Sequence, residues 1–436
     1  MIKRSLLLAA AAAGAMWTTG ALAQANEQFI PALVYRTGPY APNGIPFANG
    51  FADYLNLVNN RDGGINGVKI TFEECETGYA TDRGVECYER LKGKGPTGAA
   101  AFSPLSTGIT FALIEKAPTD KIPIITMGYG RSETVDGAVF PWIFPYLGTY
   151  WDAADILVKY ITEKSGGSLK GKKVALVYHD SPFGKEPIPV LQALSKNLGF
   201  EFEALPVTHP GVEQKATWLK VRQSRPDYVL MWGWGVMNST AIKEAAAVNY
   251  PRDKIFGVWW SGAEPDVRPA EGGAKGYSAA ALQHGAGTYN VHADIVKHVY
   301  DKGQGAGKKD EVGEVLYNRG MVNAMLTVEG IRAAQGKYGK KPLTGEQVRW
   351  GLENLAITND QLKQLGMEGL MRPLQVSCQD HAGAHFGRVQ QWDGKNWAFV
   401  SDYIQADQGL LGPMIKAAAQ KYAEEKKITP GCLQGP

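Results

Sequence analysis

The stretch from Phe29 to Glu76 places the strongest constraint on the fold, because its pattern changes from strand to helix and back to strand. Residues 29–35 are apolar and β-prone, and residues 37–46 contain three Pro and two Gly, which predicts an irregular loop. Apolar residues at helical spacing then predict a helix, and they are Phe47, Phe51, Leu55 and Val58. A Gly-Gly pair at 63–64 ends this helix, and residues 68–72 form a second strand.

A strand, a helix and a parallel strand connected in this order form a right-handed βαβ unit. A sheet of such units leaves its ligand crevice at the carboxyl ends of its strands, which places residues 35–40 at a binding site. The alternation continues with helices at 81–92 and 107–117 and strands at 98–103 and 123–127. A second alternating block runs from 151 to 260. Two successive blocks predict two α/β lobes, each a parallel sheet flanked by helices.

Two parts of the chain resemble the leucine/isoleucine/valine-binding protein family, the type I periplasmic solute-binding proteins of ABC importers. The first part comprises VYRTGPYAPNG and NNRDGGINGVKI, at residues 34–44 and 59–70, and resembles the start of the mature family proteins. The second part is HPGVEQKATWLKVRQSRPDYVLMWGWG, at residues 209–235, and resembles the stretch before a central strand of the family's second lobe. The resemblance covers nearly the whole mature chain in order.

The resemblance implies a two-lobed type I periplasmic-binding-protein fold with three crossover segments. Residues 24–146 and about 277–355 would form lobe I, residues 147–276 and about 370–405 lobe II, and residues 406–436 a C-terminal helix and tail. It also implies that the lobes close over a small-molecule ligand by hinge bending and deliver it to an ABC permease in the inner membrane. No enzyme activity is expected, and we expect the protein to be a monomer.

The N-terminus has the pattern of a secretory signal peptide covering residues 1–23. Lys3 and Arg4 precede an apolar run, and Ala21-Leu22-Ala23 is the small-residue pattern before a cleavage point. The apolar run is shorter than the roughly 20 residues that a membrane-spanning helix needs. No Cys follows the cleavage point, so a lipid anchor is not expected. The sequence therefore predicts a protein secreted to the periplasm.

Charge and motifs exclude several classes of function. Lys and Arg number 46 against 43 Asp and Glu, which gives no electrostatic reason to expect nucleic acid or an anionic membrane as a partner. The sequence lacks the patterns GxxxxGK[ST], HExxH and GxSxG, and its one GxGxxG follows a helix and precedes a strand. Cys378, His381 and His385 are spaced like metal ligands, but a Cys held in a disulfide cannot ligate as thiolate. We therefore predict no cofactor and no metal.

Four cysteines stand in a chain bound for an oxidising compartment, where an even number usually means disulfides. Three connectivities are open, and buried free thiols are the alternative. We favour Cys75 with Cys87, because the strand ending near Cys75 leads into a helix that packs back over it. Cys378 would then be joined to Cys432 by exclusion.

Candidate ligand-binding residues in the first lobe follow the predicted strands, and they are Tyr35, Tyr40, Ser103, Ser106, Thr107 and Tyr129. Hydroxyls beside free N–H groups at a helix N-terminus suit a carboxylate, so Ser103, Ser106 and Thr107 are the carboxylate candidates. The structural alternative is an ordinary helix N-cap. In the second lobe the candidates at the strand ends are Tyr178, Trp232, Trp234 and Trp260. Aromatic walls suit a flat or apolar ligand, and core packing is the alternative.

The resemblance favours a small hydrophobic amino acid of the branched-chain type as ligand. In the family's amino-acid binders, Ser and Thr meet the carboxylate and an acidic side chain of the second lobe meets the ammonium, a position to which Glu264 corresponds. The loop GYGRSE departs from the family's Ala-Thr pattern at Tyr129 to Arg131. The alternative ligand is a small aromatic or aliphatic carboxylate, with Arg36 or Arg131 as its partner. Other classes left open are the ligand-binding subunit of a sensory receptor and a secreted hydrolase.

Overall fold

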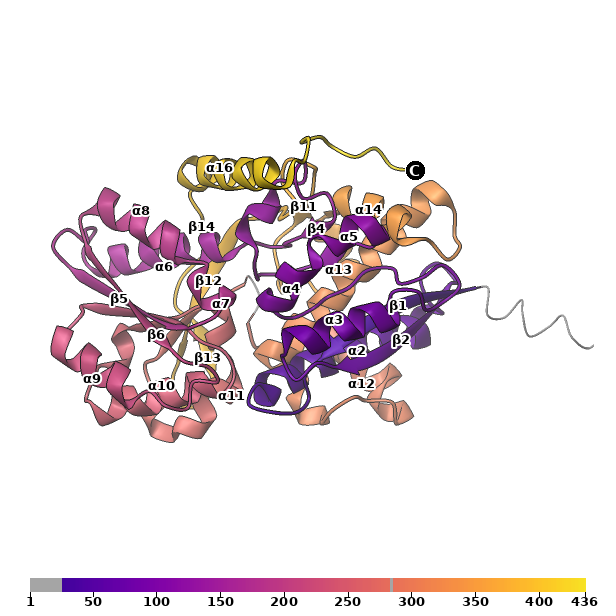
Figure 1. The fold of residues 1–436 in the computed structure, drawn as a ribbon. Coiled ribbons are helices and arrows are strands. Elements are labelled where there is room, and N and C mark those ends of the chain that lie inside the picture. Colours follow the sequence, from indigo (N-terminus) through magenta and orange to yellow (C-terminus); the bar gives the residue numbers. More distant parts are fainter. Residues whose placement is uncertain (1–25, 283–284) are drawn as a thin grey trace, which may run out of the picture.

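The computed structural model describes residues 26–282 and 285–436, so the predicted signal peptide lies outside the described residues. Figure 1 shows two lobes side by side, each built from a sheet with helices against it. The first lobe contains the indigo N-terminal part of the chain together with orange helices from beyond residue 310. The second lobe contains the magenta central part and the yellow strands near the C-terminus. The predicted α/β two-lobed fold is confirmed.

Short parallel strands form the sheet of the first lobe. They are β1 (Glu27–Val34), β2 (Lys69–Glu76), β3 (Ile124–Ile125) and β4 (Ile143–Phe144). β1 pairs with β2 and β3 pairs with β4. Single parallel bridges from Ala99 to Phe29 and from Phe102 to Ile124 connect the two pairs, so the predicted strand at 98–103 is reduced to two bridges. The carboxyl ends of all these segments therefore meet at one edge of the sheet.

Helices cover this first sheet. They are α2 (Ala41–Asp62), α3 (Thr81–Leu91), α4 (Thr107–Leu113), α5 (Lys116–Asp120), η1 (Ser132–Val135), α12 (Asn290–His298), η5 (Tyr300–Lys302), η6 (Lys309–Glu311), α13 (Val315–Tyr338), α14 (Gly345–Glu353) and α15 (Asn359–Gln364), with the strand pair β10 (Ala356–Ile357) and β11 (Leu374–Gln375).

Two of these helices differ from the sequence prediction because of proline. α2 begins inside the predicted loop, since Pro42 occupies the first turn, where no intrahelical N–H is needed. The predicted helix at 107–117 is split into α4 and α5. Pro118 has no N–H to donate to the carbonyl of Ile114, and a proline ring also clashes with the carbonyl four residues earlier.

Helices α2 and α13 pack against each other at glycines. A Cβ on Gly320 of α13 would lie 1.9 Å from the carbonyl oxygen of Phe47, and a Cβ on Gly50 of α2 would lie 2.0 Å from that of Tyr317. Both distances are far below a van der Waals contact, so only glycine permits this approach. The close contact fixes α13 beside the space between the lobes.

The second lobe contains a larger, mixed sheet. Its strands are β5 (Lys173–His179), β6 (Glu201–Val207), β7 (Tyr228–Trp232), β8 (Ile255–Gly257), β9 (Ser278–Ala281), β12 (Phe386–Trp392), β13 (Trp397–Phe399) and β14 (Ile404–Gln405). The order is β13-β12-β9-β8-β7-β5-β6, with β14 also paired to β12. The five strands from β5 to β9 are parallel, whereas β12 is antiparallel to β9, β13 and β14. The sheet is parallel except at this edge, where strands joined by a tight turn such as Asp393-Gly394 pair antiparallel.

The helices of the second lobe are α6 (Tyr150–Lys164), α7 (Pro182–Lys185), α8 (Ile188–Leu198), α9 (Lys215–Ser224), α10 (Val236–Ala247), η2 (Arg252–Lys254), η3 (Trp259–Ser261), α11 (Glu264–Val267) and η4 (Arg268–Ala274). The apolar run at residues 255–260 is a strand only as far as Gly257, and its two tryptophans lie on the 3-10 turn η3. This turn carries Trp259 and Trp260 out of the sheet and toward the first lobe.

The chain passes between the lobes before α6, after β9 and before β12. A further connection is the C-terminal helix α16 (Gln408–Lys426), which lies across both lobes in Figure 1. At its start, the backbone N–H of Asp407 donates to Asp155 of α6 at 2.7 Å. Near its end, the ring of Tyr422 lies 4.7 Å from that of Phe140 in the first lobe.

Both predicted disulfides are confirmed. Cys75 at the end of β2 is bonded to Cys87 of α3, and Cys378 is bonded to Cys432 in the C-terminal tail. The first bridge fixes α3 on its sheet, and the second ties the segment after α16 back to the first lobe. Because Cys378 takes part in a disulfide, it is not available as a metal ligand.

Candidate ligand-binding site

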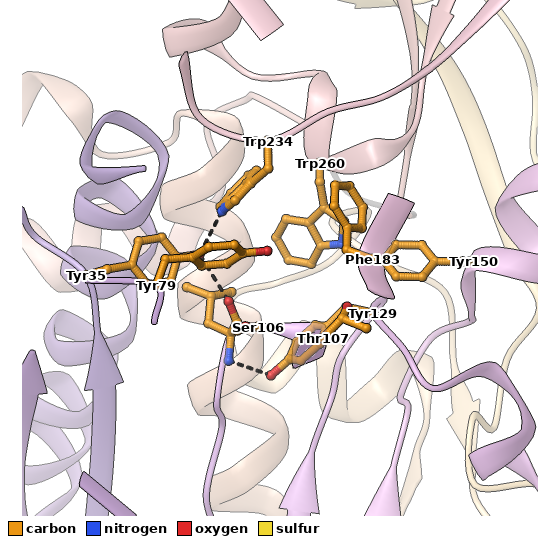
Figure 2. A pocket seen from close by; sticks show the side chains of 10 residues that line it. Tyr35, Tyr79, Ser106, Thr107, Tyr129, Tyr150, Phe183, Trp234 and Trp260 are labelled. Atoms are coloured by element: carbon orange, nitrogen blue, oxygen red, sulfur yellow. Dashed lines mark hydrogen bonds between the residues drawn. The ribbon is translucent and has the colours of Figure 1, made fainter. Parts of the chain in front are cut away.

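A cavity lined by aromatic rings lies between the two lobes, and Figure 2 shows these side chains converging on it. We call it the ring cavity and define it by its lining residues. They are Tyr35, Tyr79, Leu105, Ser106, Thr107 and Tyr129 from the first lobe and Tyr150, Phe183, Trp234 and Trp260 from the second. The space among these side chains is about 240 Å³, which includes part of its opening to solvent.

The topology explains why these residues meet. In the first lobe, Tyr35 follows β1, Tyr79 follows β2 and Tyr129 follows β3, so all three lie at the carboxyl edge of one sheet. The second lobe turns the corresponding edge of its own sheet toward them. Phe183 follows β5 and Trp234 follows β7. The ring cavity is therefore formed where the carboxyl edges of two parallel sheets face each other.

Hydrogen bonds hold several rings in place. The indole N–H of Trp234 donates to the hydroxyl oxygen of Tyr35 at 3.1 Å, and this hydroxyl donates to the carbonyl of Leu105 at 3.1 Å (Figure 2). The hydroxyl of Tyr129 accepts from the N–H of Leu105 at 2.8 Å and donates to the carbonyl of Ile125 at 3.1 Å. These hydroxyls are occupied by the protein itself, so Tyr35 and Tyr129 present mainly their rings to a ligand.

The ring cavity is uncharged at neutral pH. Within the described ranges, no acidic or basic side chain lines it. Burial raises the pKa of Tyr35, Tyr129 and Tyr150 well above the ordinary tyrosine value, so these phenols stay protonated. The remaining polar groups are hydroxyls. The oxygen of Thr107 is buried without a hydrogen-bond partner among the described residues, although it lies near the hydroxyl of Tyr150.

Direct contacts between the lobes close the ring cavity. The indole N–H groups of Trp259 and Trp260 both donate to the carbonyl of Gly128, at 2.6 and 2.9 Å. The amide of Asn43 donates to Asp266 at 2.9 Å. Each of these hydrogen bonds joins a first-lobe group to a second-lobe group, so they form only when the lobes are together.

A second, wider space of about 770 Å³ adjoins the ring cavity and shares Tyr79, Ser106 and Phe183 with it. We call this space the vestibule. It is also lined by Tyr40 and His179, whose hydroxyl and Nε2 atom lie 2.7 Å apart across the lobes. Burial, together with the neighbouring His209, lowers the pKa of His179 to about 4, so this imidazole is neutral at neutral pH.

Six of the residues predicted for ligand binding line the ring cavity, and they are Tyr35, Ser106, Thr107, Tyr129, Trp234 and Trp260. Tyr40 lines the vestibule. Four others line neither space. Ser103 donates to the side-chain oxygen of Asn323 at 2.9 Å. Tyr178 and Trp232 pair with each other in the strand register of β5 and β7, and Trp232 is fully buried in the lobe. Glu264 accepts from the N–H of Val315 at 3.1 Å.

The two arginines considered as carboxylate partners are paired elsewhere. Arg36 forms an ion pair with Glu74 at 2.6 Å and also donates to Asn49. Arg131 forms an ion pair with Glu133. Neither arginine lines the ring cavity.

Sequence reasoning missed four lining residues, Tyr79, Leu105, Tyr150 and Phe183. Tyr79 was predictable, because it lies just after β2, and residues that follow the carboxyl ends of parallel strands face the ligand crevice. Phe183 lies on the short helix α7, which follows β5. Tyr150 begins α6 directly after the chain leaves the first lobe, and this position carries no local pattern.

Two sheet-based lobes that close over a small buried cavity define a two-lobed solute-binding protein. The comparison with protein families agrees, since the model for the periplasmic binding protein family matches residues 27–396. The chain therefore belongs to the periplasmic binding protein family, whose members are solute-binding transport components located in the periplasm. The described residues contain no helix that is long and apolar enough to cross a membrane.

Solved structures support the same family. A protein from the Pseudomonas fluorescens group, described as an ABC transporter permease, is 45% identical, with a TM-score of 0.86 over 94% of this chain and 100% of that one. A branched-chain amino acid ABC transporter protein from Thermus thermophilus with bound valine is 20% identical, with a TM-score of 0.73 over 88% and 98% of the two chains. A solute-binding protein from R. palustris in complex with benzoate is 16% identical, with a TM-score of 0.65 over 87% and 98%. No curated protein matches the sequence.

Proposed function

We propose that this protein is the periplasmic substrate-binding component of an ABC importer and that it binds a small aromatic or branched aliphatic carboxylate. The observation that carries the ligand class is the lining of the ring cavity, which has seven aromatic rings and, in the part of the chain that the structure describes, no acidic side chain. The closed lobes would present their joint surface to a membrane permease, which releases the ligand from the cavity. This role requires binding and release without chemical change.

The lining favours a carboxylate over an α-amino acid. An ammonium group loses its hydration when it is buried, and this cost is offset only by an anionic or strongly polar partner. Glu264, the residue considered for this role, points its carboxylate at the N-terminus of α13 instead. A carboxylate needs only hydrogen-bond donors, and the hydroxyls of Tyr79, Thr107 and Tyr150 line the cavity.

The aromatic walls support a flat or branched apolar ligand body. Trp234 and Trp260 lie edge to face with ring centroids 5.3 Å apart, and Tyr35 lies edge to face with Trp234 at 6.3 Å. A ring or branched chain that packs against these rings buries apolar surface at about 25 cal/mol for each Å². Relatives of the same fold hold valine and benzoate, and they are too distant in sequence to choose between the two ligand types.

The test is thermal unfolding of the mature protein with ligands that differ only in the ammonium group. Leucine and 4-methylpentanoate form one such pair, and phenylalanine and 3-phenylpropanoate form another. A ligand at about 100 times its Kd adds roughly 2.7 kcal/mol of stability. We expect the carboxylates to raise the unfolding midpoint and the matched amino acids to leave it unchanged. A shift with leucine or phenylalanine but with neither carboxylate would contradict the proposed ligand class.

A matched pair of variants on α4 tests the predicted role of a hydroxyl. Thr107→Val removes a hydroxyl that lines the ring cavity, whereas Thr110→Val removes one that donates to the carbonyl of Ser106 at 2.9 Å and does not line it. Loss of a hydrogen bond to a charged group costs about 1.5–3 kcal/mol, so we expect Thr107→Val to weaken carboxylate binding at least about tenfold. Thr110→Val should leave the Kd unchanged, although it lowers stability. Equal effects of the two substitutions on the Kd would show that the Thr107 hydroxyl does not contact the ligand.

A further inference from the structure

A buried arginine lies directly behind one wall of the ring cavity. Arg319 of α13 is fully buried and does not itself line the cavity. Its guanidinium carbon lies 4.7 Å from the ring centroid of Trp260, which does line it. Nη1 of Arg319 donates to the carbonyl of Trp259 in the neighbouring turn. The guanidinium of the first lobe is thus stacked on an indole of the second lobe.

This guanidinium has no acidic partner in contact with it. Among the described residues, its Nε and Nη2 atoms make no hydrogen bond and so contact no carboxylate. Asp266 and Glu264 act on it electrostatically, but both carboxylates accept hydrogen bonds from other groups, Glu264 from the N–H of Val315. Asp266 accepts from Asn43 at 2.9 Å, from Asn238 at 2.8 Å and from the N–H of Ala263 at 2.8 Å. A buried charge without a contacting partner is costly, so its retention calls for an explanation.

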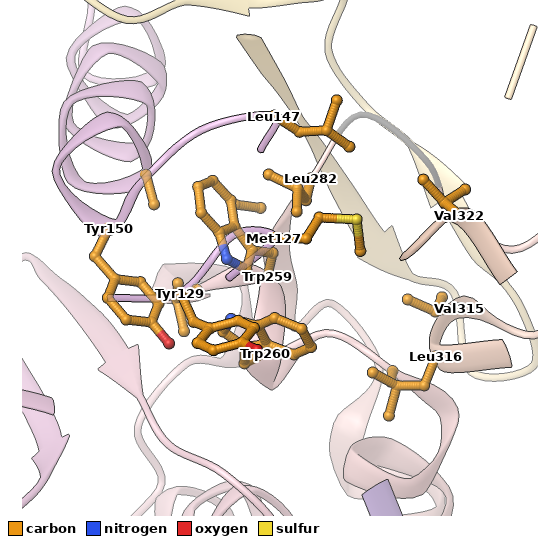
Figure 3. Close-up of a cluster of buried hydrophobic side chains, with 14 of the residues drawn as sticks. Met127, Tyr129, Leu147, Tyr150, Trp259, Trp260, Leu282, Val315, Leu316 and Val322 are labelled. Carbon is orange, nitrogen blue, oxygen red and sulfur yellow. The ribbon is translucent and has the colours of Figure 1, made fainter. Parts of the chain in front are cut away.

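Apolar side chains surround the two tryptophans that Arg319 contacts. Figure 3 shows Met127, Leu282 and Leu316 around Trp259 and Trp260, in the region where α13 faces the tryptophans. Burial lowers the pKa of Arg319 to about 9, which still leaves it protonated at neutral pH. In a poorly screened interior a charge acts over a longer distance than at the surface. The positive charge therefore reaches through Trp260 into the ring cavity.

We propose that Arg319 selects for a negatively charged ligand and against a positively charged one. This inference rests on the proposed function and adds the residue that determines the sign of the ligand's charge. Aromatic walls alone attract cations to their ring faces, so a cavity of seven rings would otherwise suit an ammonium or quaternary ammonium ligand. The guanidinium behind Trp260 opposes such a cation and attracts a carboxylate.

Arg319 also couples ligand charge to closure. It belongs to the first lobe, whereas Trp259 and Trp260 belong to the second. The guanidinium therefore meets the cavity wall only when the lobes are together. An anionic ligand gains this interaction in the closed state alone, and a ligand shifts a conformational equilibrium only through such a difference.

The experiment compares three ligands of matched shape by calorimetric titration, namely phenylacetate, phenylacetamide and phenethylammonium. We expect the wild-type protein to bind the carboxylate at least tenfold more tightly than the neutral amide and to bind the ammonium most weakly. Arg319→Met keeps the side-chain length and removes the charge, and we expect it to lower the carboxylate-to-amide affinity ratio about 10- to 30-fold. Arg319→Lys retains the charge and should keep most of the ratio.

Arg349→Met is the matched control. Arg349 is also almost fully buried, and its guanidinium lies 5.7 Å from the ring centroid of Trp142, but neither residue lines the ring cavity. We expect this substitution to lower stability and to leave the carboxylate-to-amide ratio unchanged.

Several outcomes would overturn the inference. If phenylacetate binds and Arg319→Met keeps the wild-type ratio, the charge selection is wrong while the proposed function stands. If phenethylammonium binds the wild-type protein as well as the amide does, the inference also fails, and this result does not depend on whether any variant folds. If neither the aromatic carboxylates nor the branched aliphatic one binds, the proposed ligand class and the role of Arg319 fail together.

Discussion

Glu264→Gln distinguishes a role in binding a ligand ammonium from a structural role, because it removes the charge and keeps the size of the side chain. Glu264 is 5% exposed, and its Oε2 accepts from the N–H of Val315 at the start of α13. A Gln at this position keeps an oxygen that can accept the same bond. If Glu264 bound a ligand ammonium, the substitution would weaken binding. The structure instead predicts an effect on stability.

The size of this effect follows from the pKa of Glu264. Burial, and secondarily the charge of Glu314, raises this pKa from 4.5 to about 7 in the folded protein. The folded state therefore binds a proton more readily than the unfolded state, and the stability gained from this difference is lost as the pH rises from 4.5 through 7. With about 1.4 kcal/mol for each pKa unit, the ionised carboxylate costs the folded protein about 3 kcal/mol near pH 8 and less than about 1 kcal/mol near pH 5.

The assay is the unfolding midpoint of wild-type protein and Glu264→Gln near pH 8 and near pH 5, together with the Kd for the best carboxylate. We expect the variant to be more stable than the wild type by about 1–3 kcal/mol near pH 8 and nearly equal to it near pH 5, with an unchanged Kd at both. A destabilised variant at about pH 8, or one that loses ligand affinity at least about tenfold, would refute this interpretation of Glu264.

Three further predictions concern closure, packing and the tail. Trp234→Phe removes the N–H that donates to Tyr35 across the lobes, so we expect about 1 kcal/mol weaker ligand binding, measured by titration, with the ligand-free midpoint nearly unchanged. Gly320→Ala places a Cβ 1.9 Å from the carbonyl oxygen of Phe47, so thermal unfolding should show a loss of at least about 3 kcal/mol, whereas Gly336→Ala, with open space, should show none. Cys432→Ser opens a bridge spanning 54 residues, which should cost about 4 kcal/mol, and an unchanged midpoint would contradict this estimate.

The elements of both lobes were largely predictable from local pattern. The helical spacing of apolar residues in α2 and the apolar runs of β5 and β7 are strong signals. Because the ligand crevice lies at the carboxyl ends of parallel strands, the positions of Tyr35 and Tyr129 at the site were then predictable. Element ends were less predictable, because they depend on single residues. Pro118 divides one predicted helix into two, and the chain leaves β8 three residues before Trp260.

The composition of the site was harder to predict, because it depends on how the two lobes meet. Trp232 and Trp234 are two residues apart in the sequence, yet Trp232 is in β7 and packs in the lobe, while Trp234 lies beyond the strand and bonds to Tyr35. Arg319 lies near the start of the buried helix α13, where no sequence pattern distinguishes it. Its contact with Trp260 exists only because two distant segments come together in the closed lobes.

A crystal structure of the mature protein with its tightest-binding carboxylate is the most direct test of the ring cavity as the ligand site. We predict that the ligand's apolar body packs against Trp234 and Trp260, with its carboxylate within hydrogen-bond distance of the Thr107 hydroxyl. The same structure should show the Arg319 guanidinium still stacked on Trp260. A ligand bound in the vestibule beside His179, or anywhere outside the ring cavity, would contradict the account.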